Sequence, residues 1–151
     1  MDIRKFSVEP TGRLHLRDAA DQLMYAEDAD GKPDPTKPIA VNLYGPGSKQ
    51  YARAQAQQQN RMVDKLKRKG KTDQTADQKA EEAAEFLSGC TAGFENLEYD
   101  QLQGEALAKA VYMDPSIGFI AEQVGKHLGD WGNFSKPSTT ISASTSGKAP
   151  G

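Results

Sequence analysis

The residues that could carry out chemistry are few in this sequence, and they lie far apart. The chain has two histidines, His15 and His127, and one cysteine, Cys90. Nucleophilic catalysis would need Cys90 or a serine beside a histidine that an acid orients, and nothing in the sequence suggests such a meeting. Cys90 falls on the apolar side of an expected helix, where a thiol usually serves as a small core residue. CxxC, HxxxH and EF-hand patterns are absent from the sequence, so we predict a non-enzyme without a cofactor or metal site.

The stretch GPGSK, which begins at Gly45, is the one place where a phosphate site could be expected. A nucleotide-binding loop of the GxxxxGK[ST] type places its lysine before the hydroxyl residue, whereas Lys49 follows Ser48 here. The dinucleotide pattern fails as well, because Gln50 stands where the third glycine belongs. The stretch therefore predicts a plain turn from a strand into a helix, with Ser48 as the N-cap.

Charge is strongly segregated along the chain. Residues 49–71 hold eight basic residues and one acidic residue, whereas residues 72–105 hold nine acidic residues and one basic residue. A basic run of this kind can neutralise nucleic-acid phosphates. Against that reading, no aromatic residue lies between Arg61 and Lys71, the acidic block follows at once, and the isoelectric point is about 5.7. Nucleic acid is therefore an unlikely partner, and a docking surface or a solvated helix end is favoured.

Hydrophobic periodicity predicts an α+β fold with a small N-terminal antiparallel sheet of two or three strands. Residues 39–44 alternate between apolar and polar side chains, and residues 13–17 alternate in the same way. A further short strand is expected at residues 23–26. Residues 27–38 contain three prolines and are expected to form an exposed loop. Residues 1–8 are expected to be a short strand or an arm.

About four helices are expected after the sheet. A long helix should run from Ser48 to a terminating Gly70. A second should open with a capping box at Thr75 and carry an apolar stripe that extends to Phe94. Two shorter helices should cover residues 105–113 and 114–128. The core residues that these patterns predict are Leu87, Phe94, Leu107, Val111, Ile117, Ile120 and Val124.

Composition indicates a single hydrophilic domain with a thin core. Only 36% of the residues are apolar and the mean hydropathy is −0.72. The sequence contains no signal peptide and no apolar run of about 18 residues, which predicts a cytoplasmic protein without a membrane span. We expect one domain over residues 1–134, with a β region at 1–47 and a helical region at 48–134. The Ser/Thr/Gly/Pro-rich residues 135–151 are expected to form a disordered tail.

Several stretches, taken together, resemble the small tail assembly chaperones of long-tailed bacteriophages and prophages. These stretches are TGRLHL, IAVNLYGPGSKQY, LSGCTAGFEN, AVYMDPSIGFIAEQV and DWGNF, and the similarity extends over about residues 5–135. The resemblance implies an assembly factor made in the cytoplasm of the infected host and absent from the finished virion. Such proteins coat the tape-measure protein, keep it soluble and help recruit tail-tube subunits. Many also have a longer form, made by a programmed ribosomal frameshift.

If the chain shields a tape-measure protein, it needs apolar surface backed by charge. The candidate residues lie on the long helix and in the closing DWGNF stretch: Tyr51, Met62, Leu66, Lys65, Lys67, Arg68, Lys69, Trp131 and Phe134. The alternative is that these residues only complete the core of the monomer. Two other functions stay open, a minor structural protein of the tail or the head–tail junction and a small nucleic-acid-binding regulator. A homo-oligomer is also possible.

Overall fold

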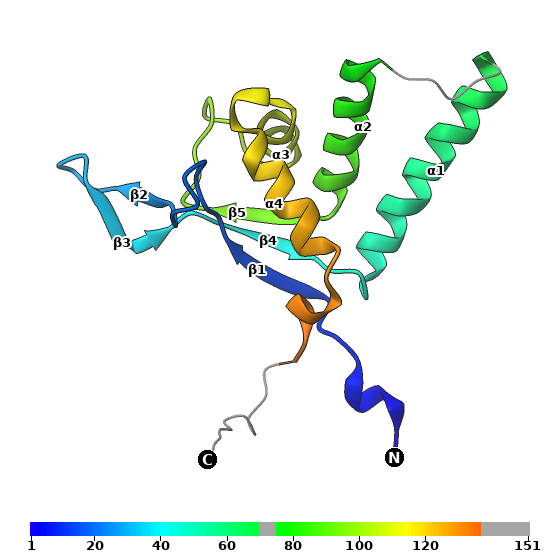
Figure 1. Ribbon diagram of the computed structural model, residues 1–151, viewed down its shortest axis with the longest axis horizontal. Coiled ribbons are helices and arrows are strands. Elements are labelled where there is room, and N and C mark those ends of the chain that lie inside the picture. Colours follow the sequence, from blue (N-terminus) through cyan, green and yellow to red (C-terminus); the bar gives the residue numbers. More distant parts are fainter. Residues whose placement is uncertain (70–74, 137–151) are drawn as a thin grey trace.

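The computed structural model describes residues 1–69 and 75–136 (Figure 1). Its central sheet has three strands in the order β1–β4–β5, with both pairs antiparallel: β1 (Thr11–His15), β4 (Ala40–Tyr44) and β5 (Thr91–Glu95). A separate hairpin consists of β2 (Tyr25–Glu27) and β3 (Pro33–Pro38). The helices are α1 (Lys49–Lys69), α2 (Ala76–Gly89), α3 (Gly104–Met113) and α4 (Gly118–Leu128). The predicted α+β class, with a small antiparallel sheet and four helices, is confirmed.

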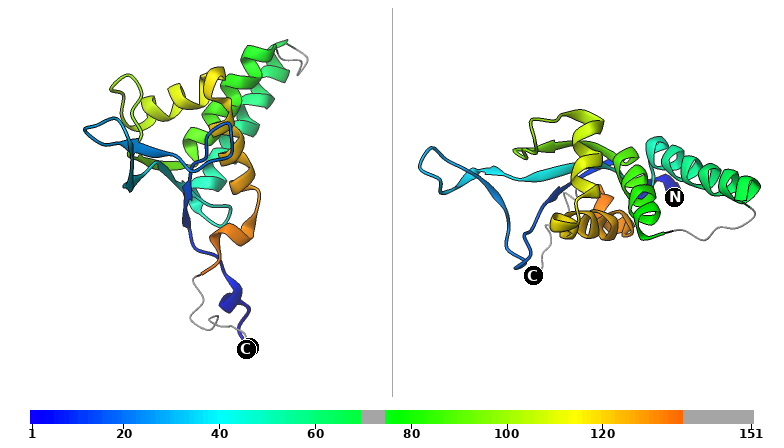
Figure 2. Two further views of the ribbon diagram at one scale, coloured as in Figure 1. Left: turned by 60° about the vertical axis from the view of Figure 1, so that its left-hand side comes forward. Right: turned by 90° about the horizontal axis from the view of Figure 1, so that it is seen from above.

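The central strand β4 organises the core. Val41 and Leu43 are completely buried, and the register places Leu14 of β1 and Phe94 of β5 directly opposite Val41. The Phe94 ring meets the Tyr112 ring of α3 at a centroid distance of 5.9 Å, so this face of the sheet packs against the helices. Figures 1 and 2 show α3 and α4 over the sheet, whereas α1 extends away from the body at its side.

The predicted starts of α1 and α2 are confirmed, and the predicted start of the last helix at Asp114 is that of a 3-10 turn before α4. Ser48 caps α1, because its Oγ accepts a hydrogen bond from the Tyr51 N–H at 3.1 Å. A complete capping box forms around Thr75 at the start of α2. Asp114 and Pro115 are the N-cap and first residue of a short 3-10 turn, Pro115–Ile117, that leads directly into α4. Capping is a local interaction, and this is why the sequence predicts it well.

The expectation of a helix that continues to Phe94 is wrong. Helix α2 ends at Gly89, and the next residues form β5, which pairs with the second edge of β4. The apolar residues between Thr91 and Glu95 fit the spacing of a helix as well as that of a strand. The strand forms because the free edge of β4 supplies backbone hydrogen-bond partners. The third strand therefore comes from the middle of the chain, and β structure is not confined to residues 1–47.

Two further expectations near the N-terminus need correction. Residues 27–38 are not wholly loop, because β3 pairs with β2. Within the described chain β3 pairs with β2 alone, so its three prolines lie in an edge strand, where a missing N–H is tolerated. For residues 1–8 the strand alternative is wrong and the arm alternative stands, because they contain a 3-10 turn, Ile3–Phe6, whose residues are all exposed.

Five of the seven predicted core residues are buried, and the other two, Phe94 and Ile117, are partly buried against the same cluster. The largest fully buried side chains include several that the sequence did not single out as core, among them Leu16, Val41 and Leu43. The expected disordered tail lies, from residue 137 onward, outside the described residues.

Candidate partner-binding surface

One face of α1 packs against α2. Tyr51 meets Phe86 edge-on at a centroid distance of 5.5 Å, and Ala54 is 4% exposed. Farther along the same face, the Lys65 Nζ lies 3.1 Å from a carboxylate oxygen of Glu82. Burial raises the pKa of the Tyr51 hydroxyl, as expected for a ring enclosed between two helices. Tyr51 therefore belongs to the α1–α2 interface and offers little surface to a partner.

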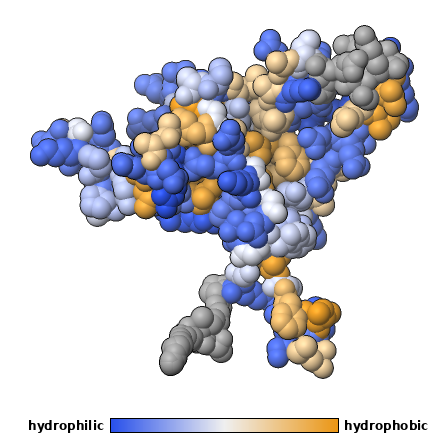
Figure 3. Space-filling view, viewed as in Figure 1, coloured by the Kyte–Doolittle hydropathy of each residue, from blue (hydrophilic) through white to orange (hydrophobic). Residues whose placement is uncertain are grey.

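A second row of apolar residues runs along another side of α1, and no described element covers it. Met62, Val63 and Leu66 are 44%, 48% and 49% exposed. Val63 and Leu66 continue a spacing of four and three residues along the helix, which is the spacing of a coiled-coil seam. We call this row the outer stripe; its exposed members are Ala52, Ala56, Gln59, Met62, Val63 and Leu66. In Figure 3 its far end forms an orange patch at the upper right.

The basic residues at the end of α1 do not act as one patch. Lys65 is half-buried and bonded to Glu82 of α2, so the fold itself uses this charge. Lys67 and Arg68 are exposed, but only Lys67 lies beside the outer stripe, next to Val63, whereas Arg68 projects from another side of the helix. The side chain of Lys69 lies outside the described part of the structure. The basic α1 and the acidic α2 thus attract each other within the chain, which leaves fewer cations for a nucleic acid.

The two aromatic residues of the DWGNF stretch have opposite environments. Both lie in the 3-10 turn Trp131–Phe134, but Trp131 is 57% exposed and Phe134 is 1% exposed. The Phe134 ring packs on His127 at a centroid distance of 5.5 Å, and its carbonyl accepts from the Glu9 N–H at 2.7 Å. The expectation that Phe134 contacts a partner is therefore corrected: it closes the core, whereas Trp131 stays accessible.

Cys90 and the two histidines are held in place by contacts within the fold. Cys90 is completely buried at the end of α2, and burial raises the pKa of its thiol to about 12. His15 bonds the Met24 carbonyl at 2.8 Å and packs against Tyr25, while burial lowers the pKa of His127. Among the described residues, no group of three or more His, Cys, Asp or Glu side chains could hold a metal ion.

Cys90 should resist alkylation in the folded protein. A thiol that is both inaccessible and almost entirely protonated at pH 8 reacts slowly, because the thiolate is the nucleophile. We expect iodoacetamide to label Cys90 at least about tenfold more slowly in the native chain than in the urea-unfolded chain. Equal rates, followed by mass spectrometry, would show that α2 and β5 open readily around this residue.

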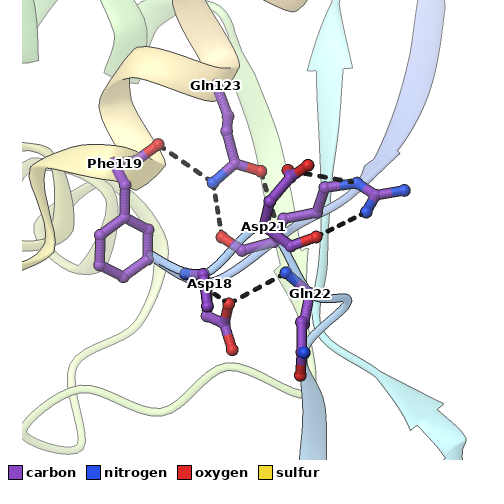
Figure 4. A network of polar contacts seen from close by, with 7 residues as sticks. Asp18, Asp21, Gln22, Phe119 and Gln123 are labelled. Atoms are coloured by element: carbon purple, nitrogen blue, oxygen red, sulfur yellow. Dashed lines mark hydrogen bonds and ion pairs between the residues drawn. The ribbon is translucent and has the colours of Figure 1, made fainter.

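Gln123 joins α4 to the loop after β1, a contact that sequence patterns did not predict (Figure 4). The Gln123 side chain accepts from the Arg17 N–H at 2.7 Å and donates to the Arg17 carbonyl at 2.6 Å. It also donates to the Phe119 carbonyl at 3.0 Å. Below it, Asp18 accepts from the N–H groups of Ala20 and Gln22, which closes the loop on itself. An exposed-looking glutamine on a helix does not reveal such a role in sequence.

An apolar pocket opens between the base of the hairpin and helices α3 and α4. Its volume is about 230 Å³, and we call it the Ile39 pocket. The lining residues are mostly aliphatic or aromatic, with one charged residue: Met24, Ile39, Leu97, Glu98, Tyr99, Val111, Ile117 and Ile120. The Tyr99 hydroxyl donates to Asp114 at 2.8 Å, so a second carboxylate lies beside one of its walls.

Comparisons with protein-family models, with curated proteins and with solved structures found no match to this chain. Within residues 1–69 and 75–136, none of the helices combines the length and the apolar character that a membrane crossing requires. The candidate surface therefore rests on the geometry of the outer stripe, Trp131 and the Ile39 pocket.

Proposed function

We propose that this chain is a tail assembly chaperone, which binds the tape-measure protein of a long-tailed phage or prophage. It keeps that protein soluble in the host cytoplasm and helps recruit tail-tube subunits. The observation that carries the proposal is the outer stripe of α1, an apolar row on a helix that is already packed against its own fold. The resemblance of the quoted stretches to tail assembly chaperones supplies the identity of the partner.

The outer stripe suits a helical partner. A seam with spacings of four and three residues accepts the apolar face of a second amphipathic helix. Lys67 beside the stripe favours a partner helix with an acidic flank, and it disfavours a second α1, which carries the same charge. A long tape-measure chain rich in amphipathic helix would offer many such segments.

The contact formed by one copy should be weak and reversible. Met62, Val63 and Leu66 are already about half covered, so their complete burial would contribute about 1 kcal/mol each. A weak contact repeated along a long partner keeps that partner covered, and it also allows each chaperone to leave when the tail tube assembles. The α1–α2 contacts, including the Lys65–Glu82 ion pair, hold the stripe in place without induced folding.

Co-expression with the tape-measure protein tests the proposal. The wild-type chain should raise the soluble yield of the tape-measure protein, and Val63→Asp with Leu66→Asp should abolish the gain because it places charge in the seam. Gln57→Asp with Asn60→Asp is the matched control: it adds the same charge to exposed positions off the stripe and should keep the gain. All variants should show the same thermal unfolding.

Two outcomes would count against the proposal. If the stripe variant still solubilises the tape-measure protein, α1 is not the docking surface. If the wild-type chain gives no gain, the chaperone function itself is wrong. Detection of the chain in purified virions by mass spectrometry would instead favour a structural tail protein.

A further inference from the structure

We infer that the N-terminal arm of one copy, residues 1–7, inserts Phe6 into the Ile39 pocket of a second copy of this chain. This contact is separate from the outer stripe and does not depend on the tape-measure protein. It joins the most exposed apolar segment of the described chain to a pocket whose lining is mostly apolar.

The arm is a preformed apolar projection. Ile3 and Phe6 are 75% and 66% exposed, and they lie three residues apart in a 3-10 turn, so their side chains point to the same side. Asp2 caps this turn by accepting from the Arg4 N–H at 2.9 Å. In Figure 3 the arm is a separate orange group at the lower right, below the body of the protein. Exposed apolar side chains on a projecting turn are typical of a segment that a partner covers.

The Ile39 pocket fits this segment in size and in charge. An apolar cavity of roughly 150 Å³ admits a benzene molecule, so the volume of about 230 Å³ accommodates a phenylalanine ring. Glu98 lines the pocket, and Asp114 is bonded to Tyr99 in its wall. Arg4 and Lys5 precede Phe6 directly. Arg4 is already paired with Asp2 at 2.6 Å, so insertion of the ring would bring Lys5 to Glu98, whereas the outer stripe has Lys67 beside it and would repel Lys5.

The arm cannot reach the pocket of its own chain. The Glu9 N–H is bonded to Phe134, and Val8 packs beside Gly47, so the chain is anchored at these residues. Phe6 is two residues from Val8, so the Cα atoms of these two residues can lie at most about 7 Å apart. The pocket lies beyond the far end of β1, where Leu16 bonds Ile39 and Met24, and five strand residues span about 17 Å. An arm that fills this pocket must therefore belong to another copy.

The geometry determines the kind of assembly. The arm projects away from α3 at the lower end of the molecule (Figure 1), whereas residues of α3 and α4 line the pocket, so one arm–pocket contact joins two different parts of the surface. Two copies that exchange arms form a closed symmetric dimer with two such contacts, and several copies joined head-to-tail form a closed ring. Either assembly should depend on protein concentration and weaken as salt screens the charges around Glu98.

Sedimentation equilibrium of the full chain tests the inference. Between roughly 10 µM and 1 mM, the range expected for a contact with one aromatic anchor, the average mass should rise above that of the monomer. Phe6→Asp should weaken association at least about tenfold, whereas Phe6→Leu should largely preserve it. A free peptide of residues 1–8 should compete and lower the mass of the wild-type chain. Because Phe6 is exposed, neither substitution should change thermal unfolding.

Exchange of the charges at Glu98 and Lys5 tests whether the Ile39 pocket is the site that receives the arm. Glu98→Lys should weaken association, and combination with Lys5→Glu in the same chain should restore it. Glu122→Lys, an exposed position on α4 away from the pocket, should have no effect. A wild-type chain that stays monomeric over the whole concentration range would overturn the inference. So would an unchanged mass distribution in Phe6→Asp or in Glu98→Lys.

Discussion

Replacement of Phe134 by alanine should lower the free energy of unfolding by about 3–5 kcal/mol, the usual cost of removing a buried phenylalanine. The Phe134 ring is 1% exposed and closes the base of the sheet beside β1 and β4. It also packs on His127 of α4. Its loss would therefore open a cavity between a strand and a helix far apart in the sequence. Chemical denaturation should measure the change, and the melting temperature should fall by roughly 10–20 °C.

Trp131→Ala is the matched control, because Trp131 is an aromatic residue of the same 3-10 turn but is 57% exposed. Its replacement should change stability by less than about 1 kcal/mol. A small effect at Phe134 together with a large effect at Trp131 would contradict the arrangement of this turn. Equal effects would indicate that the turn as a whole, and not the Phe134 ring, closes the core.

Gly45→Ala should destabilise the fold by about 1–3 kcal/mol, the usual cost of forcing an extra methyl group into a packed core. Gly45 is buried at the end of β4, and an added Cβ would overlap the ring of Phe134. Gly12 shows the same close approach, with the ring 2.8 Å from the position of its missing Cβ. Gly45 does not have a positive φ, so the predicted cost comes from contact and not from backbone strain.

Gly125→Ala tests this reason with the same chemical change. Gly125 lies inside α4, and an added Cβ there would meet no atom within 4 Å. Alanine should therefore stabilise the helix by about 0.5–1 kcal/mol. In a double-mutant cycle, Gly45→Ala combined with Phe134→Leu should cost less than the sum of the two single changes. Additive costs would show that the Gly45 methyl group does not contact this ring.

The sequence by itself determined the features that depend on neighbouring residues. The capping interactions of Ser48, Thr75 and Asp114 were predicted at the residues where they occur. The helices, the strand at β4 and the α+β class followed from periodicity. Each of these features depends on side chains within about one helical turn or a few strand residues of each other. A short stretch of sequence therefore contains all the residues that determine each of these features.

Only the tertiary structure decided the features that join distant parts of the chain. Phe94 lies in a strand because an unpaired edge of β4 is available, and Phe134 is buried because two glycines leave room for its ring. The candidate surface was decided in the same way. The apolar residues of α1 are distributed over more than one face of the helix. Only the packing of α2 against one of these faces places Tyr51 in the interior and leaves Leu66 exposed in the outer stripe. Periodicity shows which residues share a face, but the exposure of a face depends on which element packs against it.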